Sequence, residues 1–212
     1  MIDLRTFSFI DQLQPEFASF IATVSKGFLP LEGQAALFVE VAPGMSINVV
    51  TDVVLKSTSV IPGMQIVERA YGLLEVHSED QGMVKEAGER ILDFFQLKET
   101  DRLSPRVVSN QIITGVENHH TAIVNRMRHG DFILAGETML VLEVHPAGYA
   151  AIAANEAEKA AEVRLLEVVT FGAYGRLWLA GKEEEINEAW KAIRSVLESI
   201  DGRPNEGKSL IM

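Results

Sequence analysis

Apolar and polar positions along the chain form one pattern that occurs twice. Each copy begins with a short apolar segment typical of a strand, continues through a helical spacing of apolar positions and returns to a strand. These three segments cover residues 4–9, 14–25 and 35–41 in the first copy and residues 107–112, 117–128 and 139–144 in the second. Pro43 and Pro146 end the second strand of each copy, because proline donates no hydrogen bond to a strand ladder. Both copies therefore begin as strand, helix, strand.

The second part of each copy is also shared. A helix is expected over residues 46–58 and again, in an alanine-rich form, over residues 150–163. A hairpin follows, and an amphipathic helix closes the copy. In the second copy this last helix is indicated by apolar residues at steps of four and three: Ile186, Trp190, Ile193, Leu197 and Ile200.

An ungapped internal repeat supports this parallel. At an offset of 103 residues, positions 33–77 share 11 identities with the second copy, whereas unrelated sequences would share about 3 at typical residue usage. We therefore expect an α+β fold, an α/β sandwich of two tandem units of the order β-α-β-α-β-β-α with antiparallel-rich sheets. The expected domains are residues 1–103 and residues 104–212, the second with a short flexible C-terminal tail.

Composition limits the classes of partner. The chain has 212 residues, 47% of them hydrophobic, and a net charge of −11, which would repel a nucleic-acid backbone. There is no cysteine, so disulfides, thiolate metal sites and cysteine nucleophiles are excluded. The longest charge-free runs fall short of the roughly 18 residues that a membrane span needs. We expect a soluble cytoplasmic protein without nucleic-acid or membrane partners.

Catalytic signatures are missing from the sequence. It contains no phosphate loop, zinc-protease motif, nucleophile elbow or dinucleotide fingerprint. His119 and His120 are adjacent on a helix and point about 100° apart, which favours solvated helix polarity over a metal site. His77 and His145 stand singly in the sequence, without an acidic partner at a fixed spacing. We therefore expect no enzyme activity, no metal and no cofactor.

The two hairpins share a scaffold but differ in one feature. Ala70, Tyr71 and Gly72 recur in the second copy at the same offset, as Ala173, Tyr174 and Gly175. Glu68 and Arg69, an adjacent pair of opposite charges, are replaced there by Phe171 and Gly172. The charged pair belongs to the first hairpin alone, and glycine at position 172 removes a side chain and leaves space.

These segments resemble those of bacterial microcompartment shell proteins. AANEAEKAAEV is similar to the small-residue signature helix of that family, and ERAYGLLEV and FGAYGRLWL are similar to its pore-loop hairpin. Two such units in one chain resemble the tandem-domain shell proteins. The strand and helix that normally close a unit open it here, as in the circularly permuted branch, and the likeness is to its carboxysome-type stacked trimers.

The resemblance implies a ferredoxin-like shell tile that forms a homotrimer mimicking a hexagon, in the shell of a bacterial microcompartment in the cytoplasm. It implies that Glu68 and Arg69 gate a central pore for small metabolites. It places Lys56 and Lys159, which occupy the same position of the two copies, at the tile edge against neighbouring hexamers and pentamers. Face-to-face stacking of two trimers stays an open alternative here, as does the encapsulated pathway.

A second function from another class also fits the sequence. A trimeric regulatory module of ferredoxin-like units, binding a small effector between subunits, would have the same repeat and the same lack of catalytic groups. Extended sheets or stacked trimers in electron microscopy would favour the tile, whereas saturable effector binding by discrete trimers would favour the module.

Overall fold

The computed structural model describes residues 2–206. Eight strands and six α-helices alternate along these residues, with two short 3-10 turns. The elements are β1 (Asp3–Ile10), α1 (Pro15–Val24), β2 (Ala35–Ala42), α2 (Ile47–Ser57), β3 (Ile61–Glu68), β4 (Tyr71–Ser78), α3 (Gln81–Phe95), β5 (Arg106–Ile113), α4 (Asn118–Met127), β6 (Thr138–His145), α5 (Tyr149–Ala160), β7 (Arg164–Val169), β8 (Gly175–Gly181) and α6 (Glu183–Ser199). The order β-α-β-α-β-β-α predicted for each copy is confirmed.

Each half of the chain builds one four-stranded antiparallel sheet. The strand orders are β1-β2-β4-β3 and β5-β6-β8-β7, so the two sheets have the same topology. Both place a bulge near the start of the opening strand's pairing, at Leu4/Thr6 and Val107/Ser109. The repeat in the sequence is therefore a repeat in structure.

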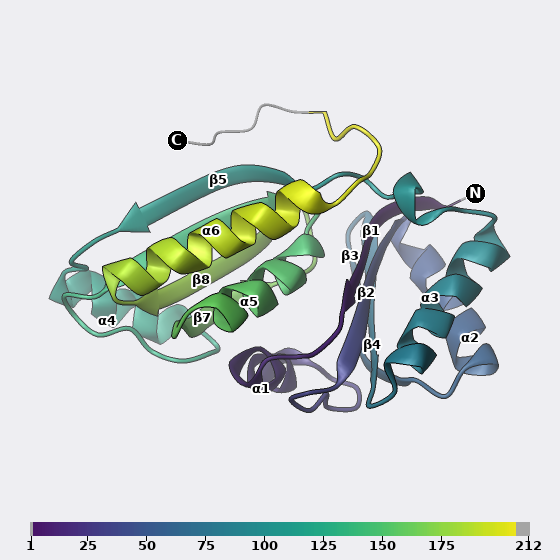
Figure 1. The fold of residues 1–212 in the computed structure, drawn as a ribbon, viewed down its shortest axis with the longest axis horizontal. Coiled ribbons are helices and arrows are strands. Elements are labelled where there is room, and N and C mark those ends of the chain that lie inside the picture. Colours follow the sequence, from purple (N-terminus) through teal and green to yellow (C-terminus); the bar gives the residue numbers. More distant parts are fainter. Residues whose placement is uncertain (1, 207–212) are drawn as a thin grey trace.

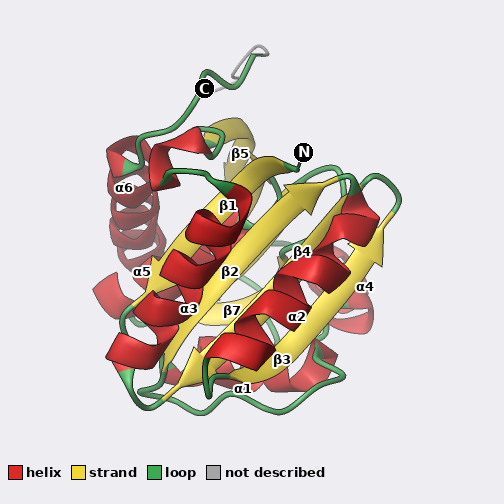
Figure 2. Cartoon of the chain, turned by 90° about the vertical axis from the view of Figure 1, so that its right-hand side faces the viewer, coloured by secondary structure: helices red, strands yellow, loops and turns green. Residues whose placement is uncertain are grey.

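Helices cover one face of each sheet. Figure 2 shows α2 and α3 lying side by side on the first sheet. Ile47, Val50 and Val54 of α2, spaced three and four residues apart, are fully buried between this helix and the sheet. In the second half, α5 and α6 take the same position, and the alanines of α5 permit close packing (Figure 1).

Helix α1 does not lie in the helical layer that α2 and α3 form. It lies between the two halves in Figure 1, and its counterpart α4 lies at the far end of the second half. Phe17 of α1 stacks on Phe38 of the first sheet, with ring centroids 6.1 Å apart. The same helix contacts α5 and β7, so one core cluster contains residues of both halves.

Residues 201–206 depart from the expected flexible tail. The carbonyl of Arg203 accepts a hydrogen bond from the Ser104 amide at 2.9 Å, and the Asn205 side chain donates to the carbonyls of Ser104 and His145. These bonds hold the segment against the connection between the two halves. The remainder of the expected tail, residues 207–212, lies outside the described residues.

Among residues 2–206, no helix is long and apolar enough to cross a bilayer.

Candidate functional site

The first hairpin presents the charged pair at its tip. Glu68, the last residue of β3, pairs with Tyr71, the first of β4, so only Arg69 and Ala70 form the turn. Arg69 has a φ of +53°, the left-handed conformation that tight two-residue turns require. Its guanidinium Nε lies 3.6 Å from the Glu68 carboxylate, and its side chain is 92% exposed. The pair is therefore local, and the Arg69 side chain lies in solvent.

The second hairpin is wider and lies beside the first. Five residues, 170–174, separate β7 from β8 there. Gly172 has a φ of +94°, and a Cβ at this position would lie 3.6 Å from the Cγ of Glu68. The structure thus brings Glu68 next to the residue that replaces Arg69 in the second copy. Phe171 packs partly against the core, and Ala70 and Ala173 are exposed.

The shared glycines of the hairpins allow a close backbone approach. A Cβ on Gly72 would lie 2.3 Å from the Gly44 carbonyl oxygen, and a Cβ on Gly175 would lie 2.3 Å from the Ala147 carbonyl oxygen. Both carbonyls belong to the turn that precedes a helix, α2 or α5. Each hairpin base is therefore fixed against the start of a helix, which explains why this part of the hairpin is identical in both copies.

The shared tyrosines are connected by a polar cluster. Tyr71 lies under the guanidinium of Arg5, 3.5 Å from the ring centroid, and Tyr174 contacts the ring of His145 edge to face. Arg5 donates from Nε to Glu40 at 2.8 Å and lies 3.0 Å from His145 through Nη2. The bases of the two hairpins are thus linked through buried Arg5.

The charged and polar side chains of this cluster have hydrogen-bond partners within it. Glu40 also accepts from the Gly148 amide at 2.9 Å. Burial raises the pKa of the Glu40 carboxyl, and Arg5 opposes that rise. Burial and the nearby Arg5 lower the pKa of His145, so this ring is neutral at pH 7. Its Nδ1 donates to the Asn205 side-chain oxygen at 2.9 Å, which leaves Nε2 to accept from Arg5.

His77 has an acidic partner that the sequence pattern did not reveal. Its Nδ1 lies 3.0 Å from the carboxylate of Glu75, and both side chains are buried. Residues two apart on a strand face the same way, so the spacing that was interpreted as unpaired places the two groups together. Burial raises the pKa of Glu75. No group of three or more metal-ligating side chains occurs among residues 2–206.

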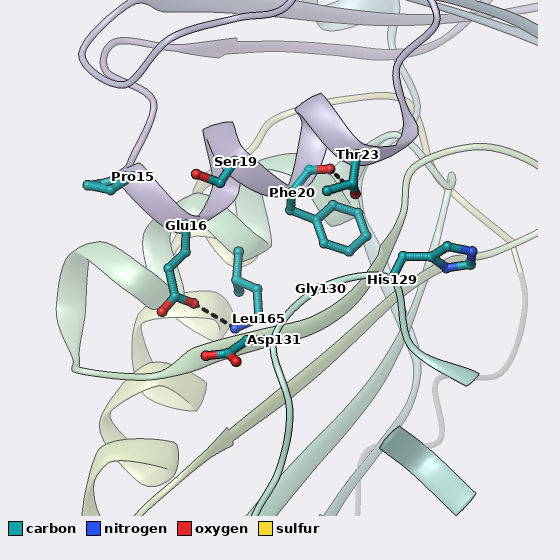
Figure 3. Close-up of a pocket in the computed structure, with 9 residues that line it drawn as sticks. All are labelled: Pro15, Glu16, Ser19, Phe20, Thr23, His129, Gly130, Asp131 and Leu165. Carbon is teal, nitrogen blue, oxygen red and sulfur yellow. Dashed lines mark hydrogen bonds between the residues drawn. The ribbon is translucent and has the colours of Figure 1, made fainter. Parts of the chain in front are cut away.

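A cavity of about 340 Å³ lies where α1 meets the second half. Glu16, Ser19, Phe20 and Thr23 of α1 line it, and Figure 3 shows Glu16 pointing towards Leu165 and Phe20 towards Gly130. The Glu16 carboxylate accepts a hydrogen bond from the Leu165 amide at 2.8 Å. This bond makes Glu16 part of the joint between the halves, and its partial burial there raises the pKa of its carboxyl.

The two repeated lysines lie on corresponding helices in different surroundings. Lys56 of α2 pairs with Asp52 at 2.8 Å and is well exposed. Lys159 of α5 is half exposed, 3.6 Å from Glu156 as its i, i+3 spacing predicts, and 3.7 Å from Asp11 of the first half. Both ammonium groups reach solvent at the ends of their helices.

Comparison with known proteins gives a consistent result. A family model described as the CsoS1D N-terminal domain matches residues 4–101. Carboxysome shell protein CcmP of Synechococcus elongatus is 48% identical over 206 residues, which cover 97% of both chains. Carboxysome shell protein CsoS1D of Hydrogenovibrio crunogenus is 50% identical over 204 residues, 96% of this chain and all of the relative.

The chain belongs to the CsoS1D family of carboxysome shell proteins.

Solved structures agree with this family over the whole chain. The fused permuted hexameric shell protein MSM0275 of the RMM microcompartment is 42% identical, with a TM-score of 0.92 over 95% of this chain and 99% of that one. The double ringed trimeric shell protein MSM0271 is 39% identical, with a TM-score of 0.94 over 97% and 100%. Membership in the CsoS1D family confirms the tandem permuted fold and the class of structural shell protein. The regulatory module finds no support in these relatives.

Proposed function

We propose that this chain is a shell tile of a carboxysome-type microcompartment that assembles as a pseudohexameric trimer around a gated pore. The observation that carries the proposal is the contact between the two hairpins: Glu68 and Arg69 form an exposed tip, and Glu68 lies beside Gly172. A three-fold axis at this point would place three copies of each charged residue in one ring. Residues 1–103 and 104–212 would each supply one shell unit.

Glu68 and Arg69 would open and close that ring by exchanging positions. Solvent-exposed ion pairs contribute about 0–1 kcal/mol, so two arrangements of the ring can be close in free energy. Gly172 leaves room for the exchange because it has no side chain, and Phe171 fixes the second hairpin by packing inward. Ala70, Tyr71, Gly72 and their counterparts Ala173, Tyr174 and Gly175 would hold the hairpin bases still while the tip moves. Small metabolites would pass when the ring is open.

Removing the two charged side chains tests the gate. The Glu68→Ala, Arg69→Ala double variant should hold the pore open in every particle, because neither side chain is left to close the ring. Electron microscopy at side-chain resolution of the assembled protein measures the pore state. The matched control is Glu86→Ala with Arg90→Ala, an exposed ion pair on α3, which should retain the wild-type mixture. A closed pore in the double variant would overturn the gate.

The outer partners belong to the same proposal. Lys56 and Lys159 would meet neighbouring hexamers or pentamers at the tile edge, since both ammonium groups reach solvent. Face-to-face stacking of two trimers is supported by the double ringed relative. The protein would act without catalysis, as a structural component that lies in the shell inside the cytoplasm.

A further inference from the structure

The neighbours of His145 permit only one form of its ring. Every nitrogen of an arginine side chain is a donor, so Nη2 of Arg5, 3.0 Å away, needs a lone pair on His145 Nε2. The amide nitrogen of Asn205 donates to the carbonyls of Ser104 and His145, which leaves the amide oxygen facing Nδ1 at 2.9 Å. That oxygen only accepts, so the proton of the ring is on Nδ1. The ring is thus held as one neutral tautomer between a donor and an acceptor.

The cations around this ring oppose a positive charge on it. Burial is the main cause of the lowered pKa of His145, and the charge of Arg5 is the next. Arg106, which pairs with His145 across β5 and β6, lowers the pKa further, whereas the hydrogen bond to Asn205 acts in the other direction. The ring is only half-buried, so protons from solvent can still reach it. Its charge state is therefore open to control by pH.

The carboxylates on the elements around the ring are engaged with other cations or exposed. None of them forms an ion pair with His145 within the described residues 2–206. A protonated ring would consequently gain no anion in exchange for its bond to Arg5. These carboxylates are Glu40 on Arg5, Glu143 on Arg176, Asp3 on Arg203, and the exposed Asp201 and Glu206.

His145 connects this cluster to the second hairpin. Its ring contacts Tyr174 edge to face, with ring centroids 6.1 Å apart. Tyr174 is the last residue of the turn 170–174, which joins β7 to β8. Gly172 of the same turn lies beside Glu68 of the first hairpin. The position of the second hairpin next to the charged tip therefore depends on the contact between His145 and Tyr174.

The first hairpin has no such titratable contact. At the 103-residue offset, Ala42 takes the place of His145. Tyr71 lies directly under the guanidinium of Arg5 instead, and arginine keeps its charge over the whole range of working pH. A change of pH that acts through His145 would therefore loosen one hairpin and leave the other in place.

We propose that His145 is a positioning residue of the gate that responds to pH: its neutral ring holds the second hairpin against Arg5, and its protonated ring releases that hairpin. The contacts from Arg5 through His145 to Tyr174 are called the latch below. The inference rests on the proposed gate and adds a way in which the gate is regulated.

Protonation removes the hydrogen bond on which the latch depends. A proton taken up from solvent at Nε2 of His145 would bring two N–H donors together where one donor and one acceptor now lie 3.0 Å apart. Arg5 remains held by Glu40 and Tyr71, so the imidazolium is the group that moves, towards solvent. Tyr174, which is 41% exposed, then loses its support.

The direction of the effect follows from the lowered pKa of His145. A released ring is solvated, so its pKa returns towards the ordinary value of 6.5, whereas the latched ring has a lower pKa. Between these two values the released state binds more protons. The latch is therefore complete above pH 6.5 and weakens as the pH falls towards the pKa of the latched ring. One proton changes the release equilibrium by up to about tenfold for each pH unit.

Hydrogen–deuterium exchange of the full-length, assembled protein tests the latch. The amides to follow are those of the strand pairs that close the second hairpin, Val168 with Leu177 and Val169 with Arg176. After correction for the intrinsic pH dependence of exchange, their protection in the wild type should fall about tenfold over the first pH unit below 6.5. Mass spectrometry of peptides from residues 164–181 measures this protection.

His145→Gln should keep the same protection over that pH unit. A glutamine side chain can accept from Arg5 and donate to Asn205, but it does not titrate. The matched control is His119→Gln, at a histidine whose side chain is 96% exposed, and it should retain the pH dependence of the wild type.

A second variant covers the case in which His145→Gln alters the fold. Asn205→Asp would place a carboxylate beside Nδ1 of His145 and stabilise the imidazolium, so protection should be lost at a pH about one unit higher than in the wild type. Position 205 lies outside both sheets, so the fold should tolerate the change. Asn118→Asp adds the same charge at an exposed position and should cause no shift.

The outcomes separate the latch from the gate. Equal pH dependence in the wild type and in His145→Gln, together with no shift in Asn205→Asp, would overturn the latch and leave the gate intact. A closed pore in the Glu68→Ala, Arg69→Ala variant would overturn the gate, and with it the role of the latch in regulating it.

Discussion

Arg5 is the residue on which the interior of the joint depends. It is buried with Glu40, lies against Tyr71 and donates to His145 of the second half. A buried ion pair contributes little net stability when complete, but removal of one partner leaves an uncompensated charge in a medium of low dielectric. Its role is therefore to fix the relative position of the two halves and of both hairpin bases.

Arg5→Met should lower the free energy of unfolding by about 3–5 kcal/mol, because Glu40 would stay buried without its cation. Urea unfolding followed by circular dichroism measures the loss. Arg90→Met removes an arginine of comparable size from an exposed pair on α3 and should cause little change. Equal midpoints for Arg5→Met and the wild type would contradict the importance of this contact.

At the scale of elements, the hairpins combine a fixed base with a free tip. Gly72 and Gly175 allow the base of each hairpin to pack closely against the turn before a helix, whereas the Arg69 side chain projects into solvent. Because the base is identical in the two copies and the tip is not, the same element serves as scaffold in both and carries the charged pair in one. Motion at the tip therefore does not require motion of the sheet.

Gly72→Ala should destabilise the protein by about 1–3 kcal/mol, since the added methyl group would overlap a carbonyl oxygen that the backbone holds in place. Differential scanning calorimetry gives the change. In the control, Gly82→Ala at the start of α3, the added Cβ would lie 3.0 Å from Asp80 Oδ1, the exposed side-chain oxygen that accepts from the Gly82 amide. This side chain can adjust more easily than a backbone carbonyl, so the loss of stability should be smaller than in Gly72→Ala. An unchanged stability in Gly72→Ala would show that the turn before α2 can move to make room for the methyl group.

At the scale of the whole molecule, one chain carries two units and would supply one third of the proposed trimer. Its two sheets have the same topology, and α4 and α2 lie at opposite ends of the molecule. Lys56 and Lys159 lie on the corresponding helices α2 and α5, and Lys159 lies beside Asp11 of the first half. A trimer would therefore present six lysines at similar places on its rim.

Lys56→Glu with Lys159→Glu should abolish extended sheets and leave trimers intact, because like charges would meet at the edge between tiles. Negative-stain electron microscopy detects the sheets, and light scattering confirms the trimer. The control carries Lys85→Glu and Lys191→Glu on α3 and α6, which keeps the same change in net charge away from the rim. Sheets that persist in the first variant would count against a rim role for these lysines.

The sequence predicted most of the fold because the repeat allowed each segment to be compared with its counterpart. Ile47, Val50 and Val54 indicated a helix with one apolar face, and Pro43 and Pro146 marked the strand ends, all of which depend on local spacing. The signature helix and the hairpins also pointed to the correct family. Residues 201–206 were misjudged as a free tail, since their composition is polar and their hydrogen bonds come from distant segments.

Several side chains of the site were beyond sequence reasoning. Asn155 fits a polar helical run, yet it is buried because the start of α1, 141 positions earlier in the chain, uses it as a cap. Glu75 and His77 could have been paired from their strand spacing, but their burial could not. Arg5 belongs to no recognisable sequence motif, so its role in the cluster could not be predicted.

The sequence by itself determined the two-fold repetition, the order of elements, the family and the residues by which the hairpins differ. These follow from local periodicity and from identity at one offset. The tertiary structure alone decided which of the two corresponding helices, α1 or α4, has its apolar face covered. Phe20 and Ile123 occupy the same position of the same unit, and only the placement of α1 against the second half buries one and leaves the other exposed. Burial depends on contacts between distant segments, and no local pattern encodes which of two equivalent helices will receive them.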